Sequence, residues 1–490
     1  NAATAYSGAK TLTYLLTGTA NGPETGTDTY TTSVSFTSGV STTLLATKLH
    51  AAQTGAAITA DDIALPNNSP NVASSGFTVK HAPADHLKFS ASVTAQTVNI
   101  SFNLPTLRAV DPYGNLADGL NGGTVYSGAK TLGYILSGTS NGPDSGIDSF
   151  TTAVNFTGGV SSTLLATTLF RAQATTIKAD ATDLSGTDIA SNVFAVSAGL
   201  ANKLKFSTLS PPPASAASGA TWPLFSVLIC DVYGNPRGTG ADIITLSEDG
   251  PGNFGGTAAK PAVSGAASFD NITYDAAGTF NIWADDAGAL AATSNRSVTV
   301  TAGDASYFKV TTLAGSSAHT LSAGAAVDLK ITAYDAGGNL AANYAGPKTL
   351  TFTGPVASPG PINRPPLVEG VNILIVNVPV TFSGGVSDPA SPPTLQPFKA
   401  EPAVVNLDVS DSANVALNSS GLATYDLDLT VQHGAADYLA VTAPAATQTA
   451  GASFNLTSIK GYDRYGNLAD GGNAATAYSG AKTLTYLLTG

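Results

Sequence analysis

A recurring pentapeptide, Asp-x-x-Gly-Asn, carries the residues of this chain that are best suited to chemistry. Its fixed residues are Asp111, Gly114 and Asn115; Asp231, Gly234 and Asn235; Asp335, Gly338 and Asn339; and Asp463, Gly466 and Asn467. Two copies have a second carboxylate seven residues on, Asp118 and Asp470. Because Ca²⁺ prefers carboxylate and carbonyl oxygens, Asp111 with Asp118 and Asp463 with Asp470 are candidate calcium ligands.

The same pentapeptide also has the composition of a tight turn. Gly and Asn tolerate left-handed backbone angles, and an Asp side chain can accept hydrogen bonds from its own turn. Asp335 has no matching second carboxylate, and no segment resembles an EF-hand loop. The pattern therefore favours structural turns between strands, and we predict no cofactor other than this calcium candidate.

A second recurring motif, Tyr-x-Gly-x-Lys, places Lys10, Lys130, Lys348 and Lys482 at equivalent positions. Strand alternation puts each lysine on the same face as the leucine two residues later. A buried lysine beside Asn or Asp could form an intramolecular isopeptide bond. The alternative, which we favour, is a lysine whose stem packs while its ammonium reaches water. Ile244 replaces the lysine in one copy, so the fold does not require it.

Residues for catalysis or for disulfides are sparse. Cys230, the one cysteine, is the last residue of an apolar run that begins at Phe225, and we predict that it is a small buried residue. The five histidines have no metal-ligand spacing. Glu248, Asp249 and Glu401 are isolated carboxylates, so we predict that the protein is not an enzyme.

Composition argues against nucleic acid as a partner and against a membrane-spanning helix. Charged residues make up 11% of the 490 positions, the net charge is −12, and Thr, Ser, Ala and Gly dominate the rest. An acidic chain of this kind is not suited to bind nucleic acid. It contains no run of 18 apolar residues, so no membrane-spanning helix is predicted.

Alternating segments indicate β-strands throughout, and no capped amphipathic stretch indicates a long helix. The pentapeptides recur with strand-like starts upstream, which divides the chain into modules of 100–130 residues, a length typical of β-sandwiches. The predicted boundaries are 85–202, 203–305 and 306–436, the last with a Pro-rich insert at residues 354–366. Residues 1–84 resemble the back part of a module, and residues 437–490 its front part.

The chain repeats itself over a longer distance as well. Residues 473–490 are identical to residues 1–18, which gives a period of 472 residues made of four modules. Joined across this period, 437–490 and 1–84 would complete one module. Either a giant covalent chain of many repeats or a polymer of subunits joined by strand complementation would produce such a pattern. We favour the covalent chain, since the duplication spans a loop and a strand.

The succession of these segments resembles the Ig-like modules of large repetitive bacterial surface proteins of the invasin and adhesin type. The motifs are Asp-x-Tyr-Gly-Asn-Leu-Ala, Tyr-Ser-Gly-Ala-Lys-Thr-Leu-Thr-Tyr and Val-x-Phe-Thr-x-Gly-Val, and residues 263–283 are the clearest stretch. The resemblance covers most of the chain except residues 355–400. It implies an all-β fold of tandem Ig-like sandwiches in a linear rod, and an extracellular or cell-surface location.

Two functions follow from this organisation. The first is a structural unit of an extracellular filament, whose main partner is another copy of itself, head to tail. The second is an adhesin that binds glycan or another surface through one module. Its candidates are the Pro-rich loop at 355–368 and exposed aromatic residues. Trp283 follows Phe280 and Ile282 in one strand, and the sequence does not say which face is the core, although we favour packing of Trp283 within its module.

Overall fold

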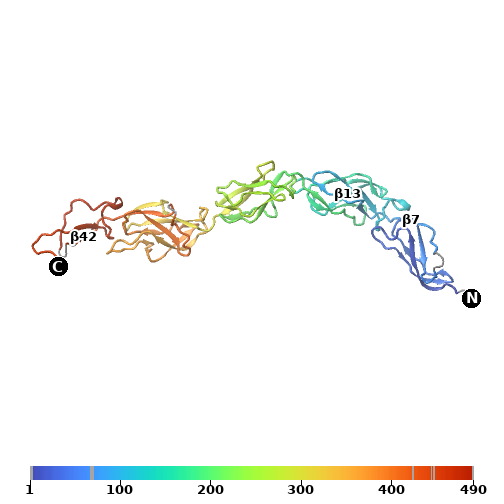
Figure 1. Ribbon diagram of the computed structural model, residues 1–490, viewed down its shortest axis with the longest axis horizontal. Helices are drawn as coiled ribbons and strands as arrows, with labels where there is room; N and C mark the ends of the chain where they lie inside the picture. Colours follow the sequence, from blue (N-terminus) through green and yellow to red (C-terminus); the bar gives the residue numbers. More distant parts are fainter. Residues whose placement is uncertain (1–3, 67–70, 422–423, 443, 445–446, 488–490) are drawn as a thin grey trace.

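A computed structural model describes residues 4–66, 71–421, 424–442, 444 and 447–487. The chain forms a row of β-domains along one long axis, with its two ends at opposite ends of the row (Figure 1). The helices in the described residues are two short 3₁₀ turns, η1 (Leu120–Gly122) and η2 (Gly472–Ala474). No described helix is long and apolar enough to span a membrane. The all-β class of tandem sandwich modules is confirmed.

The complete module at 85–202 shows how a sandwich is built. A six-stranded sheet has the order β19-β13-β15-β16-β12-β9, and two three-stranded sheets, β10-β20-β18 and β11-β17-β14, lie against it. The strands are β9 (His86–Phe89), β10 (Gln96–Thr97), β11 (Phe102–Leu104), β12 (Leu107–Val110), β13 (Gly128–Leu136), β14 (Ser149–Phe150), β15 (Ala153–Thr157), β16 (Val160–Ser161), β17 (Leu165–Thr168), β18 (Gln173–Thr175), β19 (Ile177–Ala181) and β20 (Phe194–Ser197).

The core of this module follows from strand alternation. In β13, Leu132 is buried while its neighbours Thr131 and Gly133 are exposed, because successive side chains point to opposite faces. Leu107 and Leu132 of the larger sheet join Leu165 and Phe194 of the smaller sheets in one buried cluster.

The modules at 203–305 and 306–436 have hydrophobic clusters of their own. The first contains β21 (Lys203–Phe206), β22 (Ser215–Ala217), β23 (Phe225–Cys230), β24 (Ile243–Glu248), β25 (Phe254–Gly255), β26 (Ala259–Pro261), β27 (Ala266–Phe269), β28 (Thr273–Tyr274), β29 (Gly278–Asp285) and β30 (Arg296–Thr301). The second contains β31 (Tyr307–Thr312), β32 (Ala318–Ser322), β33 (Val327–Tyr334), β34 (Gly346–Thr353), β35 (Leu367–Val368), β36 (Val371–Asn372), β37 (Val378–Ser383), β38 (Val386–Ser387), β39 (Thr394–Gln396), β40 (Val405–Asp411) and β41 (Leu427–Gln432).

The remaining strands lie in the two end segments. Residues 1–84 contain β1 (Gly8–Thr11), β2 (Thr13–Thr17), β3 (Thr29–Tyr30), β4 (Ser33–Thr37), β5 (Val40–Ser41), β6 (Thr47–Lys48), β7 (Gln53–Asp61) and β8 (Phe77–Val79). Residues 437–490 contain β42 (Tyr438–Thr442) and β43 (Ser458–Tyr462), which pair with each other. The duplicated segment is paired at one end, in β1 and β2, whereas described residues 480–487 form no strand.

Candidate functional site: the module junctions

Each Asp-x-x-Gly-Asn turn lies where one module meets the next. At the first junction, Asn115 Nδ2 donates to the carbonyl oxygen of His50 at 2.7 Å. Asn115 Oδ1 accepts the N–H of Ala52 at 2.8 Å. His50 and Ala52 belong to the preceding module, so one side-chain amide pairs with that module's backbone as another peptide group would.

This amide pairing, which we call the junction clasp, occurs at all four junctions. Asn235 binds the oxygen of Phe170 (2.9 Å) and the N–H of Ala172 (2.8 Å). Asn339 binds the oxygen of Asp275 (2.7 Å) and the N–H of Ala277 (2.8 Å). Asn467 binds the oxygen of Phe398 (2.9 Å) and the N–H of Ala400 (2.7 Å). Modules of different sequence are therefore joined through one shared contact.

The aspartate of each motif prepares the turn for this contact. Asp111 Oδ1 accepts the N–H groups of Tyr113 and Asn115, both at 2.9 Å. Its Oδ2 accepts Asn115 Nδ2 and the N–H of Ala82 in the inter-module linker, also at 2.9 Å. Gly114 has φ +90°, a left-handed conformation that glycine adopts without strain. The predicted turn is present, and its carboxylate also ties down the linker.

The linker bond is repeated at every junction. The N–H groups of Gly199, Gly303 and Gly434 donate to Asp231, Asp335 and Asp463 at 2.8–2.9 Å. All four aspartates are buried, so their charges are compensated mainly by N–H donors.

Asp335 shows the electrostatic consequence of this arrangement. Burial by itself raises the pKa of the Asp335 carboxyl. Hydrogen bonds from the Asn339 side chain and from backbone N–H groups, including that of Gly303, outweigh this effect, and the pKa lies below its ordinary value. The charged carboxylate is therefore the form that the junction prefers.

Aromatic packing reinforces three of the four junctions. The Tyr113 ring meets His50 edge to face at 4.6 Å, and the Tyr233 ring meets Phe170 at 4.9 Å. Tyr465 meets Phe398 at 5.0 Å and belongs to the hydrophobic cluster of the preceding module. The partner ring is in each case on the residue whose carbonyl binds the clasp asparagine.

The third junction is built differently. Gly337 stands in place of the tyrosine, and Asp275 stands in place of the aromatic partner. A Cβ at Gly337 would overlap the carbonyl oxygen of Asp275, so the two backbones approach more closely here. Asn339 Nδ2 adds a hydrogen bond to Ser218 Oγ at 3.0 Å. A closer polar contact thus replaces the ring pair.

Ion pairs accompany the first two junctions. Glu24 contacts His86 at 3.0 Å and also pairs with Lys88 of the next module. At the equivalent place Asp144 pairs with Lys203 at 2.6 Å and with Lys205. His86 is buried, whereas the lysines and their carboxylate partners are partly exposed, so each lysine pair contributes about 0–1 kcal/mol.

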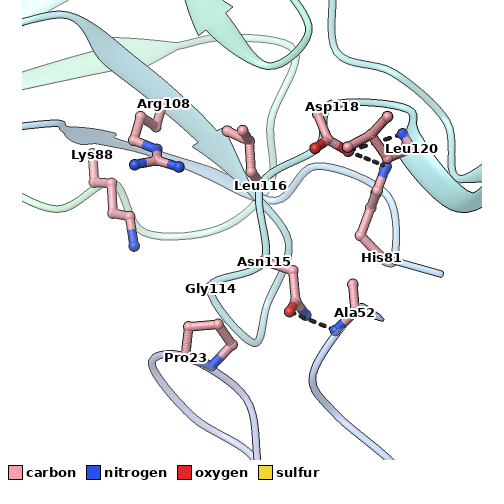
Figure 2. Close-up of a pocket in the computed structure, with 10 residues that line it drawn as sticks. All are labelled: Pro23, Ala52, His81, Lys88, Arg108, Gly114, Asn115, Leu116, Asp118 and Leu120. Carbon is pink, nitrogen blue, oxygen red and sulfur yellow. Dashed lines mark hydrogen bonds and ion pairs between the residues drawn. The ribbon is translucent and has the colours of Figure 1, made fainter. Parts of the chain in front are cut away.

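A pocket of about 410 Å³ lies beside the first junction (Figure 2). Asn115 and Asp118 line it together with His81 and Arg108. His81 Nε2 accepts the N–H of Gly119 at 3.1 Å, so the histidine holds the loop after the turn. A smaller pocket of about 260 Å³ lies at the fourth junction, beside Asn467 and His433.

The four candidate calcium ligands are all engaged by backbone N–H groups. Asp111 and Asp463 accept N–H groups within their own turns. Asp118 accepts the N–H of Leu120, and Asp470 accepts that of Gly472, both at 2.9 Å. Among the described residues, no group of three or more His, Cys, Asp or Glu side chains is arranged to hold a metal ion.

The other chemically interesting residues are dispersed. Cys230 is buried, and burial raises the pKa of its thiol to about 11, which suppresses the nucleophilic thiolate. Asp249 binds the Asn281 amide, and Glu401 pairs with Lys399 at 3.1 Å in a different module.

The motif lysines pair at the surface. Lys130 Nζ lies 2.6 Å from Asp183 and 4.3 Å from the Tyr126 ring centroid, with both charged side chains partly exposed. Lys10 and Lys348 stand over Tyr6 and Tyr344 in the same way. The stem of each lysine packs while the ammonium group remains near water, as the favoured interpretation has it.

The adhesin candidates lie in two places. Trp222 is buried in the core of its module. Trp283 is half-buried on the outer face of β29, because Phe280 and Ile282 occupy the core face. In the Pro-rich insert, Arg364 packs over the Phe398 ring at 4.5 Å, next to the fourth junction.

Comparison with known proteins adds likenesses of fold. No protein-family model and no curated protein matches the chain. Among solved structures, the Escherichia coli adhesin FdeC shares 18% identity over 72% of this chain and 99% of its own, with a TM-score of 0.32. Yersinia pseudotuberculosis InvD shares 13% over 69% and 94%, with 0.25. Surface layer protein SbsC, domains 1–6, shares 14% over 94% and 55%, with 0.19. The function is therefore argued from the chain's own residues.

Sequence reasoning identified the turns but missed the clasp. The asparagine's partners lie 64 to 69 residues upstream along the chain. A signal was present, since the clasped segments read His50-Ala-Ala52, Phe170-Arg-Ala172, Asp275-Ala-Ala277 and Phe398-Lys-Ala400. Their common alanine and their similar distance from each turn would have indicated a pairing.

Proposed function

We propose that this protein is a structural unit of a long extracellular filament or cell-surface fibre. The supporting observation is the junction clasp, which joins four pairs of modules through the same buried Asp and the same Asn, buried at three of the four junctions. A clasp at every junction restricts rotation between modules, and a row of restricted modules behaves as a rod. No catalytic activity and no cofactor form part of this proposal.

Composition agrees with such a role. A chain rich in Ser, Thr and Gly, with 11% charged residues, gives a soluble β-rich rod without a strong electrostatic field at its surface. The 472-residue period supplies a unit that can be added repeatedly along one axis. An extracellular location belongs to the same proposal.

Electron microscopy of single molecules tests the rod. We expect the 490-residue chain to appear as a straight or uniformly curved rod with a narrow distribution of angles between modules. Replacing Asn115, Asn235, Asn339 and Asn467 by Ala together is expected to broaden that distribution while each module stays folded. Native molecules that bend freely at every junction would contradict the proposal.

Adhesion is a second candidate, favoured by one observation. The loop between β36 and β37 exposes Leu374, Ile375 and Val376, of which Ile375 is 78% exposed. Three adjacent exposed apolar residues at a loop tip are typical of a contact surface. If this loop binds a surface, Ile375→Ser should reduce binding of the protein to cells, whereas Val415→Ser, a change at another exposed position in the same module, should not. Equal binding by all three proteins would remove the candidate.

A further inference from the structure

Two cationic side chains face each other in the pocket beside the first junction. Arg108 of β12 and Lys88 of β9 are directly opposite in the register of the two paired strands. Figure 2 shows the guanidinium and the ammonium group on the same side of the pocket. Like charges directly opposite each other on neighbouring strands destabilise a sheet, so the pair indicates a compensating anion.

Glu24 of the preceding module compensates only one of the two charges. It pairs with Lys88 and also contacts His86 at 3.0 Å. Arg108 forms no ion pair with a described carboxylate, and its buried Nε has no acceptor among the described residues. Buried donors in folded proteins nearly always have a partner. The rest of the Arg108 side chain is partly exposed, so an acceptor from outside the protein has access to it.

The cation pair is confined to this junction. The equivalent strand positions in the other modules are Lys205 opposite Leu228, Lys309 opposite Thr332, and Ala440 opposite Lys460. All four junctions nevertheless have the clasp, so the contact between modules does not depend on Arg108. A function other than module packing is therefore needed to explain the pair.

The pocket at the fourth junction provides an internal comparison. It is lined by the equivalent asparagine, histidine and aspartate, which are Asn467, His433 and Asp470. Among the described residues that line it, none is lysine or arginine, and Glu401 adds a carboxylate. The two pockets thus share their walls but differ in charge, and an anion fits only the first.

The remaining walls of the first pocket indicate the body of the ligand. Its volume of about 410 Å³ suits a small ligand such as a sugar. Leu116 and Pro23 offer apolar surface, and the Asp118 carboxylate offers acceptors for hydroxyl groups. The Arg108 guanidinium can bind two oxygens of one oxyanion through parallel N–H donors. An acidic sugar combines all of these features.

We propose that this pocket binds the carboxylate or sulfate group of an acidic sugar, held by Arg108 with Lys88 beside it. This inference rests on the extracellular location proposed above, since it requires contact with acidic polysaccharides outside the cell. Pro23 and Ala52 belong to the preceding module, so the bound sugar touches both sides of the junction.

A matched pair of sugars tests the anion. Methyl β-D-glucuronide and methyl β-D-glucoside differ only in a carboxylate in place of a hydroxymethyl group. In NMR titrations of the 490-residue chain at low salt, we expect the glucuronide to bind about tenfold more tightly or better. Glucose 6-sulfate is the sulfate probe. Binding of either acidic sugar supports the proposal, and the tighter of the two identifies the group.

Arg108→Leu tests the ligand residue. Leu228 occupies the equivalent position in the next module, so the sheet accommodates leucine there. We expect this variant to weaken binding of the acidic sugar about tenfold or more. Lys178→Leu removes one positive charge from β19 of the same module, outside the pocket, and should leave binding unchanged. Arg108→Lys keeps the charge but loses the paired donors, so its affinity should be intermediate.

Thermal unfolding separates binding from folding. Without sugar, Arg108→Leu should unfold at a temperature no lower than the native protein, because the repulsion from Lys88 is removed. Added glucuronide should raise the unfolding temperature of the native protein but not that of the variant. A purely structural role of Arg108 would give the opposite result in the absence of sugar.

Equal affinity of the native protein and Arg108→Leu would overturn this inference, as would equal binding of the glucuronide and the glucoside. Tighter binding of an acidic glutamate peptide than of either acidic sugar would assign the pocket to a protein partner instead. All of these measurements use purified sugars. Their failure is therefore distinct from a failure of the proposed rod, which electron microscopy of single molecules measures, or of adhesion through the loop at Ile375.

Discussion

At the scale of single residues, the clasp depends on one amide that both donates and accepts. Asn235 Nδ2 binds Phe170 and Asp231, while its Oδ1 binds Ala172. No other side chain of similar size except glutamine offers a donor and an acceptor in one plane. The turn could tolerate other residues after glycine, so we attribute the asparagine to the junction.

Replacing Asn235 tests this attribution. Asn235→Ala is expected to destabilise the second junction by about 1–3 kcal/mol, because Phe170 and Ala172 lose a buried hydrogen-bond partner. Hydrogen exchange at the Ala172 amide measures this opening. Asn235→Asp keeps the shape but sets an oxygen against Asp231, so we expect it to be no better than alanine. Asn103→Ala, at an exposed position in β11, is the control and should leave Ala172 protected.

The depressed pKa of Asp335 predicts how the third junction responds to acid. A carboxyl whose pKa is lower in the folded protein stabilises it at pH values above its unfolded pKa of about 4. That stabilisation is lost as the pH falls through the folded pKa. Chemical denaturation of residues 203–436 between pH 7 and pH 2 should show this loss below about pH 4.

Asp335→Asn supplies the comparison. The variant should be less stable than the native pair of modules at pH 7 and should lose less stability on acidification. An identical pH profile for both proteins would show that Asp335 is not the group responsible.

At the scale of elements, the four junctions fill the contact between neighbouring modules in two ways. Three fill the contact with a tyrosine ring, and the third brings two backbones together at Gly337. The turn itself is unchanged, since Asp335 and Asn339 keep their bonds. The identity of the third turn residue is therefore set by the space left between the modules.

A substitution at Gly337 tests this view. Although the other three turns carry tyrosine here, Gly337→Ala is expected to destabilise the third junction by about 1–3 kcal/mol, because its Cβ overlaps the Asp275 carbonyl. Hydrogen exchange at the Ala277 amide is the readout. Ala336 is exposed in the same turn, so Ala336→Ser should be neutral. If Gly337→Ala leaves the stability of the third junction unchanged, the contact at this position has room for a methyl group.

At the scale of the whole molecule, the junctions combine buried hydrogen bonds with partly exposed ion pairs. The clasp residues Asn115, Asn235 and Asn467 are buried, and salt does not screen neutral hydrogen bonds. The ion pairs that Glu24 and Asp144 form with lysines are partly exposed, so dissolved salt weakens them by screening. The rod should therefore depend on the clasps.

Small-angle scattering at low and high salt separates these contributions. We expect the maximum dimension of the chain to be the same at about 0.05 M and 1 M salt, where the screening length falls to about 3 Å. A chain that becomes shorter and more variable in high salt would show that the ion pairs hold the rod straight.

The class of fold and the turns could be predicted from the order of residues alone. Period-two alternation, as at Lys130 and Leu132, depends on local backbone geometry, and the left-handed position at Gly114 follows from residue type. The 472-residue duplication also predicts that residues 437–490 and 1–84 complete one module across the period, and this stays a prediction.

The contact that each turn makes with the preceding module could be seen only in the folded protein. The clasp joins Asn115 to His50 across 65 residues, and local geometry carries no information about such a partner. Trp283 lies half-buried on the outer face, whereas we favoured packing within the module; alternation names two faces, and only packing chooses between them.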